Sequence, residues 1–249
     1  MTHLAVRELC KSYGGISALA GATLEIERPG IYGLIGPNGA GKTTLFDIIA
    51  GATVPDSGQV LLGDRDVTGL PSHRMAALGV ARTFQECRIL LEETCLDNVL
   101  FAAQRKSFAA ACAQFISRSQ AARRAQREES MRLLRLVRLE AYADAPAATL
   151  SFGQRRLLEI VSTFISAPSV FLLDEPASGV NPALLEILSA FIRTMYAERP
   201  SVFFLVEHNM EFIMSLAHDI IVMHQGAVLE RGTPQAIQAS PRVVEAYLG

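Results

Sequence analysis

The sequence predicts an α/β fold built around a mainly parallel sheet, and two patterns lead to that prediction. Short, largely apolar runs occur at residues 31–35, 170–174 and 201–206, as expected for strands that are buried on both faces of a parallel sheet. Residues 4–9 and 23–28 instead alternate apolar and polar side chains, which indicates an additional antiparallel β layer. We therefore expect one parallel core sheet and one smaller antiparallel sheet.

A glycine-rich segment follows the first apolar run and leads into a helical pattern. Gly36, Gly41, Lys42 and Thr43 fit the spacing G-x-x-x-x-G-K-[ST], in which backbone N–H groups and a helix N-terminus converge on phosphate oxygens. Lysine supplies a flexible cation, and the threonine hydroxyl is a small oxygen ligand that suits Mg²⁺. An accidental match is expected in roughly two of a thousand such sequences, so we predict nucleotide binding. The residues assigned to the nucleotide here are Gly36, Pro37, Asn38, Gly39, Ala40, Gly41, Lys42, Thr43 and Thr44.

The antiparallel layer is interrupted by glycines at residues 14–15, which are typical of a turn. Tyr13 precedes this turn and is either an ordinary half-buried tyrosine or an aromatic face that stacks on adenine. Residues 59–62 are predicted to form a short strand, and residues 81–85 close the first lobe. Gln85 is uninformative by itself, because an amide after an apolar strand is usually a surface or capping residue.

Between residues 97 and 144 the composition shifts to Ala, Arg, Leu and Gln, so a helical lobe is expected to interrupt the α/β core. Residues 131–139 place four apolar side chains near one helical face: Leu133, Leu134, Val137 and Leu139. Several arginines could indicate contact with nucleic acid or anionic lipid, but Glu128 and Glu129 dilute the run. A solvated helix face is the favoured interpretation.

A second anion-binding turn is predicted at the start of the helical pattern that follows Leu150. Ser151 is a suitable N-cap, and Gly153 allows close approach of the backbone to a ligand. Taken alone, this pattern favours a plain helix N-cap over an anion site.

Polar residues follow two of the predicted buried strands. Asp174 and Glu175 are neighbours on a strand and should therefore point in opposite directions, one toward Mg²⁺ and one toward the attacking water. Glu207 and His208 follow the strand at 201–206, and ligands bind at the carboxyl ends of parallel strands. We therefore place His208 at the nucleotide edge, and we expect residues 219–231 to finish the core as a hairpin.

Composition limits the function classes further. A chain of 249 residues with 50% hydrophobic residues can bury a core. Its formal net charge of −2 gives no electrostatic reason to expect a nucleic-acid partner. The four cysteines contain no C-x-x-C pair, which favours reduced thiols over a zinc site. No run reaches about 18 apolar residues, and the N-terminus lacks the layout of a secretion signal, so we expect a cytosolic chain that does not span a membrane.

In this order, the motifs resemble those of the ATP-binding subunit of an ABC transporter over essentially the whole chain. The glycine-rich loop resembles the Walker A motif, and residues 170–174 followed by Glu175 resemble Walker B. The signature sequence matches residues 150–154, the D-loop matches residues 178–181, and Tyr13 falls where this family carries its adenine-stacking aromatic residue. Gln85 matches the Q-loop glutamine and His208 the switch histidine.

The resemblance implies an α/β fold with a P-loop NTPase (RecA-like) core sheet, an antiparallel β subdomain and an inserted helical subdomain. It implies a single ATP-binding domain over residues 1–249. Residues 1–86 and 150–249 would form the nucleotide-binding core lobe with the β subdomain, and residues 87–149 would form the helical lobe.

Several strings resemble most closely the ATPases of branched-chain (hydrophobic) amino-acid uptake systems, namely residues 79–85, residues 174–182, Phe152 within the signature, and the closing Ala-Tyr-Leu-Gly. Related ATPases for urea uptake and lipopolysaccharide export share part of these strings and remain alternatives. Phe152 stands where the signature commonly has Gly, and Asn181 stands where many members of the family have Asp.

The resemblance also implies that two such subunits pack head to tail with ATP and Mg²⁺ at the seam. Two membrane permease subunits and, indirectly, a solute-binding protein would be partners, and the chain would lie on the cytoplasmic face of the inner (plasma) membrane. A soluble ABC mechanoprotein and a nucleotide-binding regulator without turnover remain alternative functions for the chain. The residues to which the resemblance assigns catalysis are Lys42, Gln85, Glu175 and His208. Those assigned to Mg²⁺ are Thr43, Gln85 and Asp174. Those assigned to the nucleotide on the second subunit are Ser151, Phe152, Gly153 and Gln154.

Overall fold

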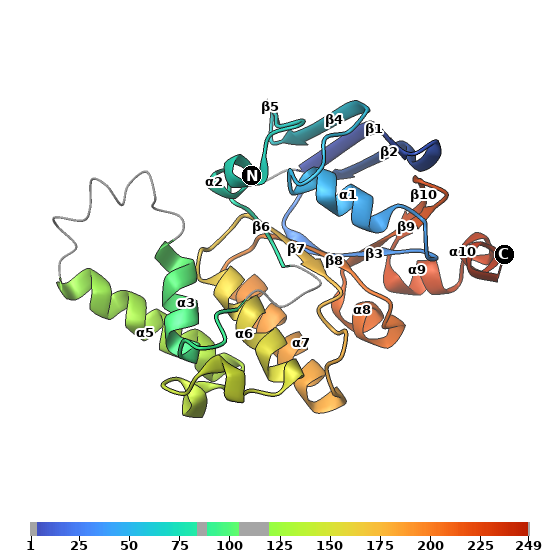
Figure 1. Cartoon of the computed structure of the whole chain (residues 1–249). Coiled ribbons are helices and arrows are strands. Elements are labelled where there is room, and N and C mark those ends of the chain that lie inside the picture. The colour runs from blue at the N-terminus through green and yellow to red at the C-terminus, as the bar shows by residue number, and fades with distance from the viewer. Residues whose placement is uncertain (1–3, 84–88, 105–119, 249) are drawn as a thin grey trace. The chain divides into compact units, whose positions relative to one another are not determined.

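The computed structural model describes residues 4–83, 89–104 and 120–248 (Figure 1). The chain divides into two compact units. The first comprises Met1–Arg82, Pro168–Pro176 and Met195–Gly249, and the second comprises Thr83–Ala167 and Ala177–Thr194. The lobe boundaries expected after residues 86 and 149 remain a prediction.

The first unit contains a six-stranded sheet with the order β10-β9-β3-β8-β7-β6. Neighbouring strands are parallel except β9 and β10, which form the predicted antiparallel hairpin. The expectation of a mainly parallel sheet is therefore confirmed. Its strands are β3 Gly30–Ile35, β6 Val80–Arg82, β7 Val170–Asp174, β8 Val202–Val206, β9 Asp219–His224 and β10 Ala227–Gly232.

The three central strands carry the apolar runs that predicted them, and every residue of β3, β7 and β8 is buried. Their register pairs Asp174 with Val206, and Leu34 with the same Val206. The carboxyl ends of these strands consequently lie at one edge of the sheet. The segments that follow them, with the glycine-rich loop, Glu175 and His208, start from that edge.

A four-stranded antiparallel sheet with the order β2-β1-β4-β5 forms the second layer of this unit. Its strands β1 and β2 are longer than the alternating pattern predicted, because bulges shift the pairing register between Val6 and Leu9 and thereby break the alternation. Residues 27–28, which were expected to continue the second strand, lie beyond it. The strands are β1 Leu4–Tyr13, β2 Ile16–Ile26, β4 Ser57–Leu62 and β5 Arg65–Asp66.

Helix α1 lies between the two sheets of the first unit (Figure 1). Its buried Phe46 contacts Phe204 of β8, with the ring centroids 5.0 Å apart, and belongs to the same apolar core as Leu4 of β1. The helix that starts at the glycine-rich loop is therefore held firmly by burial on two sides. The helices of this unit are α1 Lys42–Ile49, α2 Ser72–Ala77, α8 Met210–Leu216, α9 Pro234–Gln238 and α10 Pro241–Leu248.

The second unit is helical. Helix α3 contacts both α5 and α6, and Phe164 of α6 packs edge-to-face on Phe191 of α7, with the ring centroids 4.9 Å apart. Helix α7 begins in this unit, and its last residues belong to the first unit. The helices are α3 Cys95–Gln104, α5 Gln120–Leu136, α6 Phe152–Phe164 and α7 Pro182–Glu198, with 3-10 turns at Glu140–Tyr142 and Ala147–Thr149.

The predicted helix at residues 131–139 was wrong at its end. Helix α5 stops at Leu136, and Arg138 takes a positive φ of 57°, which ends the helical path. Val137 and Leu139 are nevertheless buried, as are Leu133 and Leu134. The apolar pattern thus identified four core residues but not the helix end.

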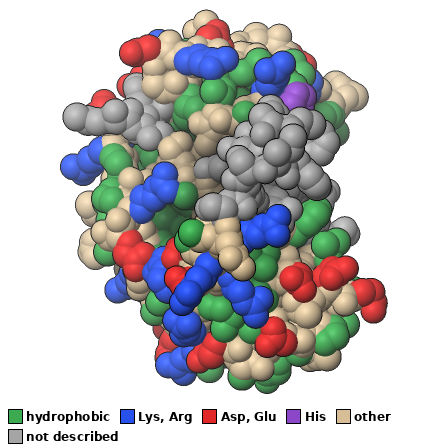
Figure 2. Space-filling model, turned by 90° about the vertical axis from the view of Figure 1, so that its left-hand side faces the viewer, with side chains coloured by type: hydrophobic (Ala, Val, Ile, Leu, Met, Phe, Trp, Pro, Cys, Tyr) green, Lys and Arg blue, Asp and Glu red, His purple; other side chains and the backbone are tan. Residues whose placement is uncertain are grey.

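The arginines of α5 pair with acidic residues on the helix surface. Arg124 contacts Glu128 at 2.9 Å, and Arg132 contacts Glu129 at 2.7 Å. Such exposed pairs contribute little to stability. Figure 2 shows both basic and acidic side chains on one face of the molecule. Within the residues that the structure describes, no helix is long and apolar enough to cross a lipid bilayer.

Candidate nucleotide site

The glycine-rich loop follows β3 and begins α1, as its spacing predicts. Gly36 has a φ of 151°, and a Cβ atom there would lie 2.2 Å from the Met223 carbonyl oxygen. Gly41 has a φ of 96°, and a Cβ atom there would lie 2.4 Å from the Ala18 carbonyl oxygen. Both glycines are therefore required by packing as well as by conformation.

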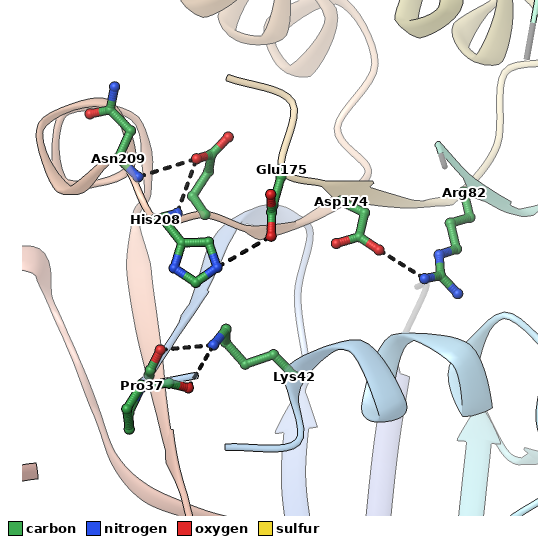
Figure 3. Close-up of polar contacts among 9 residues, drawn as sticks. Pro37, Lys42, Arg82, Asp174, Glu175, His208 and Asn209 are labelled. Carbon is green, nitrogen blue, oxygen red and sulfur yellow. Dashed lines mark hydrogen bonds and ion pairs between the residues drawn. The ribbon is translucent and has the colours of Figure 1, made fainter. Parts of the chain in front are cut away.

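Lys42 is the first residue of α1, and its side chain turns back over the loop (Figure 3). Its Nζ donates hydrogen bonds to the carbonyl oxygens of Gly36 at 2.8 Å and Pro37 at 2.9 Å. Burial lowers the pKa of Lys42, and the carboxylates of Glu175 and Asp174 partly oppose that shift. A buried ammonium that donates to two neutral carbonyl groups fits an anionic ligand, whose charge would offset the cost of burial.

The donor set for Mg²⁺ is small. Thr43 is exposed on the first turn of α1, and Asp174 is fully buried at the carboxyl end of β7. Among the described residues, no cluster of three or more His, Cys, Asp or Glu side chains could hold a metal. One hydroxyl and one carboxylate are nonetheless a suitable donor set for Mg²⁺, which binds few protein ligands and completes its shell with phosphate oxygens and water.

Glu175 and His208 meet at the edge of the sheet (Figure 3). The Glu175 Oε1 atom lies 3.2 Å from His208 Nε2, and both side chains are partly exposed. Glu175 was expected to point away from Asp174 because the two were placed on one strand. The strand instead ends at Asp174, and Glu175 has a φ of 45° while its N–H donates to the Val206 carbonyl oxygen at 2.9 Å. This strained conformation, not strand alternation, turns the Glu175 side chain toward His208.

Two residues that the sequence analysis did not assign a function support the His208 segment. The buried Glu207 carboxylate accepts hydrogen bonds from the N–H groups of His208 at 3.1 Å and Asn209 at 3.3 Å. Asn209 caps α8 by accepting the N–H of Phe212 at 3.0 Å. These contacts fix the backbone that carries His208.

Tyr13 ends β1 and is about half exposed, so one face of its ring is available to a ligand. Lys11 Nζ lies 5.5 Å from the ring centroid and 2.7 Å from Asp56 Oδ1. The same Asp56 carboxylate accepts the N–H of Ser12 at 2.7 Å. These hydrogen bonds lower the pKa of Asp56 and orient the lysine beside the aromatic ring.

The Ser151 turn lies in the second unit and forms a capping box. Ser151 Oγ accepts the N–H of Gln154 at 3.3 Å, and Gln154 Oε1 accepts the N–H of Ser151 at 2.9 Å. The predicted N-cap is therefore confirmed. Its hydroxyl lies at the exposed N-terminus of the 13-residue α6, where the backbone favours anions.

Replacing Ser151 by alanine is expected to reduce the free energy of unfolding by about 1 kcal/mol, because one cap hydrogen bond is lost. Urea unfolding of the nucleotide-free protein measures this change. Ser162→Ala, which removes a hydroxyl bonded to the Leu158 carbonyl oxygen within the same helix, is the matched control. If Ser151→Ala were no more destabilising than this control, the cap would have no structural importance.

The residues beside the cap are fixed by packing within the second unit. A Cβ atom on Gly153 would lie 2.8 Å from Leu184 Cδ1, so this glycine serves the close packing of α6 on α7. Phe152 is largely exposed, and a Cβ atom on Gly179 would lie 2.6 Å from its ring. Asn181 accepts the N–H of Leu184 at 3.0 Å and thus caps α7, a role that an amide fills as well as a carboxylate.

Two further residues belong to the description of the site, one that was predicted and one that was not. Gln85 lies outside the described residues. Tyr247 of α10 was missed by the sequence analysis. Burial raises the pKa of Tyr247, and the backbone of Gly36 in the glycine-rich loop partly opposes the shift. The last helix of the chain therefore lies close to this loop.

Comparison with known proteins identifies the family. The model of the ABC transporter family matches residues 19–178, which include the glycine-rich loop, the Ser151 turn and Glu175. The chain belongs to the ABC transporter family. The α/β class with a P-loop NTPase core is confirmed by solved cassettes. A nucleotide-free ATP-binding cassette from an ABC transporter is 27% identical, with a TM-score of 0.85 and complete coverage of both chains. The ADP conformation of MJ1267, another ATP-binding cassette of an ABC transporter, is also 27% identical with a TM-score of 0.85, and covers 100% of this chain and 99% of that one.

Curated relatives match this cassette along nearly its full length. The high-affinity branched-chain amino acid transport ATP-binding protein BraF of Pseudomonas aeruginosa is 38% identical over 99% of this chain and 97% of its own length. The protein LivG of Escherichia coli strain K12, which carries the same description, is 36% identical over 99% and 97%. A model described as branched-chain amino acid ATP-binding cassette transporter matches residues 227–249 of the cassette, which include Tyr247.

Proposed function

We propose that this ABC ATPase powers the uptake of branched-chain amino acids through a membrane permease. The observation that carries the proposal is the full-length similarity to relatives described as branched-chain amino acid transport ATP-binding proteins. The match of residues 227–249 to a model of the same description supports it. The cassette works on the cytoplasmic face of the inner membrane under two permease subunits, and a solute-binding protein delivers the substrate to them.

Two cassettes pack head to tail around two ATP molecules. The geometry supports this because one chain carries two separate anion-binding turns, the Lys42 loop of the first unit and the Ser151 turn of the second. In the dimer, the Lys42 loop of one subunit and residues 151–154 of its partner hold the same nucleotide. ATP binding therefore favours the closed dimer, and hydrolysis favours its opening.

Within each site, Lys42 and the loop N–H groups offset the charge of the phosphates, and Tyr13 stacks on the adenine ring. Thr43, Asp174 and Gln85 would hold Mg²⁺, which would neutralise charge on the phosphate oxygens. Glu175 orients the attacking water and accepts its proton, while His208 contacts the γ-phosphate and holds Glu175 through the 3.2 Å contact.

A docking segment for the permease lies just after Gln85. Leu90 and Leu91 are exposed apolar side chains of the second unit, and Asn98 fixes their backbone. Asn98 accepts the N–H of Leu90 at 2.7 Å and donates to its carbonyl oxygen at 2.9 Å. This rigid, exposed apolar segment is suited to receive a cytoplasmic helix of the permease.

Replacing Leu90 and Leu91 together by aspartate is expected to abolish co-purification with the permease, because two charges would enter an apolar contact. The exposed Val54 of the first unit, changed to Asp, serves as the control. Unchanged pull-down of the permease by the double variant would exclude this docking segment.

Reconstitution into vesicles with its permease subunits and solute-binding protein tests which solute is transported. ATP-dependent accumulation of labelled leucine, isoleucine or valine is expected, and Glu175→Gln should abolish it. Accumulation of urea with no amino-acid uptake, or extraction of lipopolysaccharide, would refute the proposal and favour the corresponding alternative.

A further inference from the structure

Arg82 joins two carboxylates on different elements of the first unit, and Figure 3 shows its contact with one of them, Asp174. Its Nη2 lies 2.8 Å from Asp174 Oδ2 at the end of β7, and its Nη1 contacts Asp47 Oδ1 on α1. The Arg82 side chain is 9% exposed and that of Asp174 is 0% exposed, so water does not screen their interaction. We call Arg82, Asp47 and Asp174 the Arg82 bridge.

The Arg82 bridge connects α1 and β7, which carry two of the three proposed Mg²⁺ ligands. Asp47 lies one turn beyond the ligand Thr43 on α1, and Asp174 of β7 is itself a ligand. A guanidinium is planar and presents its N–H groups in a fixed arrangement, so two such contacts fix both position and angle. The contact therefore sets the distance between the start of α1 and the end of β7.

We propose that Arg82 is a positioning residue for Mg²⁺. It holds the Asp174 carboxylate at the distance from the Thr43 hydroxyl that the metal site requires. The inference rests on the proposed role of those two residues at the metal. Arg82 also ends β6, three residues before Gln85, so it ties the strand that leads to the Q-loop to the same metal site.

An effect of charge alone and an effect of positioning predict opposite changes in the strength of Mg²⁺ binding. Removal of a cation beside Asp174 makes the site more negative, which would strengthen the binding of Mg²⁺. Loss of a positioning contact instead releases the ligand and weakens metal binding, typically by about 10-fold to 100-fold. The direction of the change therefore separates the two effects.

The experiment measures Mg²⁺ binding in the full chain with a fluorescent ATP analogue, both in EDTA and in a Mg²⁺ titration. We expect Arg82→Gln to raise the half-saturating Mg²⁺ concentration at least about 10-fold. Its affinity for the analogue in EDTA should match that of the unmodified protein. Arg82→Lys keeps the charge but cannot span both carboxylates, so it should show a smaller rise in the same direction.

Two more variants keep the test decisive. Asp47→Asn weakens the contact between Arg82 and α1 alone, because an amide oxygen is a weaker acceptor than a carboxylate. It should also raise the Mg²⁺ requirement, and it provides the test if Arg82→Gln does not fold. Arg231→Gln is the matched control, because Arg231 likewise bridges a carboxylate, that of Asp219 at 2.7 Å, and the Glu25 carbonyl oxygen. Asp219 lies at the opposite end of the parallel strands from the site, and this variant should leave Mg²⁺ binding unchanged.

An unchanged or lower Mg²⁺ requirement in Arg82→Lys and Asp47→Asn would overturn the proposal. Equal loss of analogue binding with and without Mg²⁺ would do so as well, because it would show a general defect of the fold. Absence of any Mg²⁺ effect in the unmodified protein would instead refute the proposed metal site itself.

Discussion

Glu175→Gln is expected to slow ATP hydrolysis by at least about 100-fold while leaving ATP binding intact. The amide keeps the size of the side chain but cannot accept a proton from water at neutral pH. Phosphate release by the purified variant measures the loss, and the fluorescent ATP analogue measures binding. The variant should also accumulate the ATP-bound dimer, since hydrolysis no longer opens it.

Glu211→Gln is the matched control for this prediction, because Glu211 is an exposed glutamate in the first turn of α8 and has the same charge. It should hydrolyse ATP at the unmodified rate. If Glu175→Gln released phosphate as fast as the unmodified protein, Glu175 would not be the general base. A nucleotide-binding regulator without turnover would then be the better description.

Lys42→Ala is expected to raise the dissociation constant for ATP by about 10-fold to 100-fold, the cost of losing a charge-assisted contact to phosphate. The Lys42 ammonium is buried against two carbonyl groups, and burial lowers its pKa. Phosphate oxygens would add negative charge next to the ammonium, so nucleotide binding should raise that pKa.

Ser151→Ala should leave this dissociation constant unchanged in the monomer, because the Ser151 turn binds the nucleotide of the partner subunit. It should instead reduce ATP-driven dimerisation and turnover. Titration of the fluorescent analogue at protein concentrations where the monomer prevails makes the comparison. Equal weakening by Lys42→Ala and Ser151→Ala would contradict this division between the two turns.

Features that depend on neighbours in the sequence were predictable. The glycine spacing located the loop before α1, and the Ser151 cap follows from a serine three residues before a glutamine. The apolar runs located β3, β7 and β8, because strands buried on both faces need apolar side chains throughout.

Features that depend on distant residues were not predictable. Arg82 lies 35 positions from Asp47 and 92 from Asp174, and no local pattern indicates that they meet. Tyr247, near the other end of the chain, lies close to the backbone of Gly36. The positive φ of Glu175 is likewise imposed by its surroundings, since a residue of this type seldom adopts it unaided.

Mixing two inactive variants tests the composite site most directly. In a head-to-tail dimer, pairing a Lys42→Ala subunit with a Ser151→Arg subunit puts both defects in one site and leaves the other site intact. The mixture should therefore hydrolyse ATP clearly faster than the sum of the two variants measured separately. Activity of the mixture equal to that sum would contradict a site shared between two subunits.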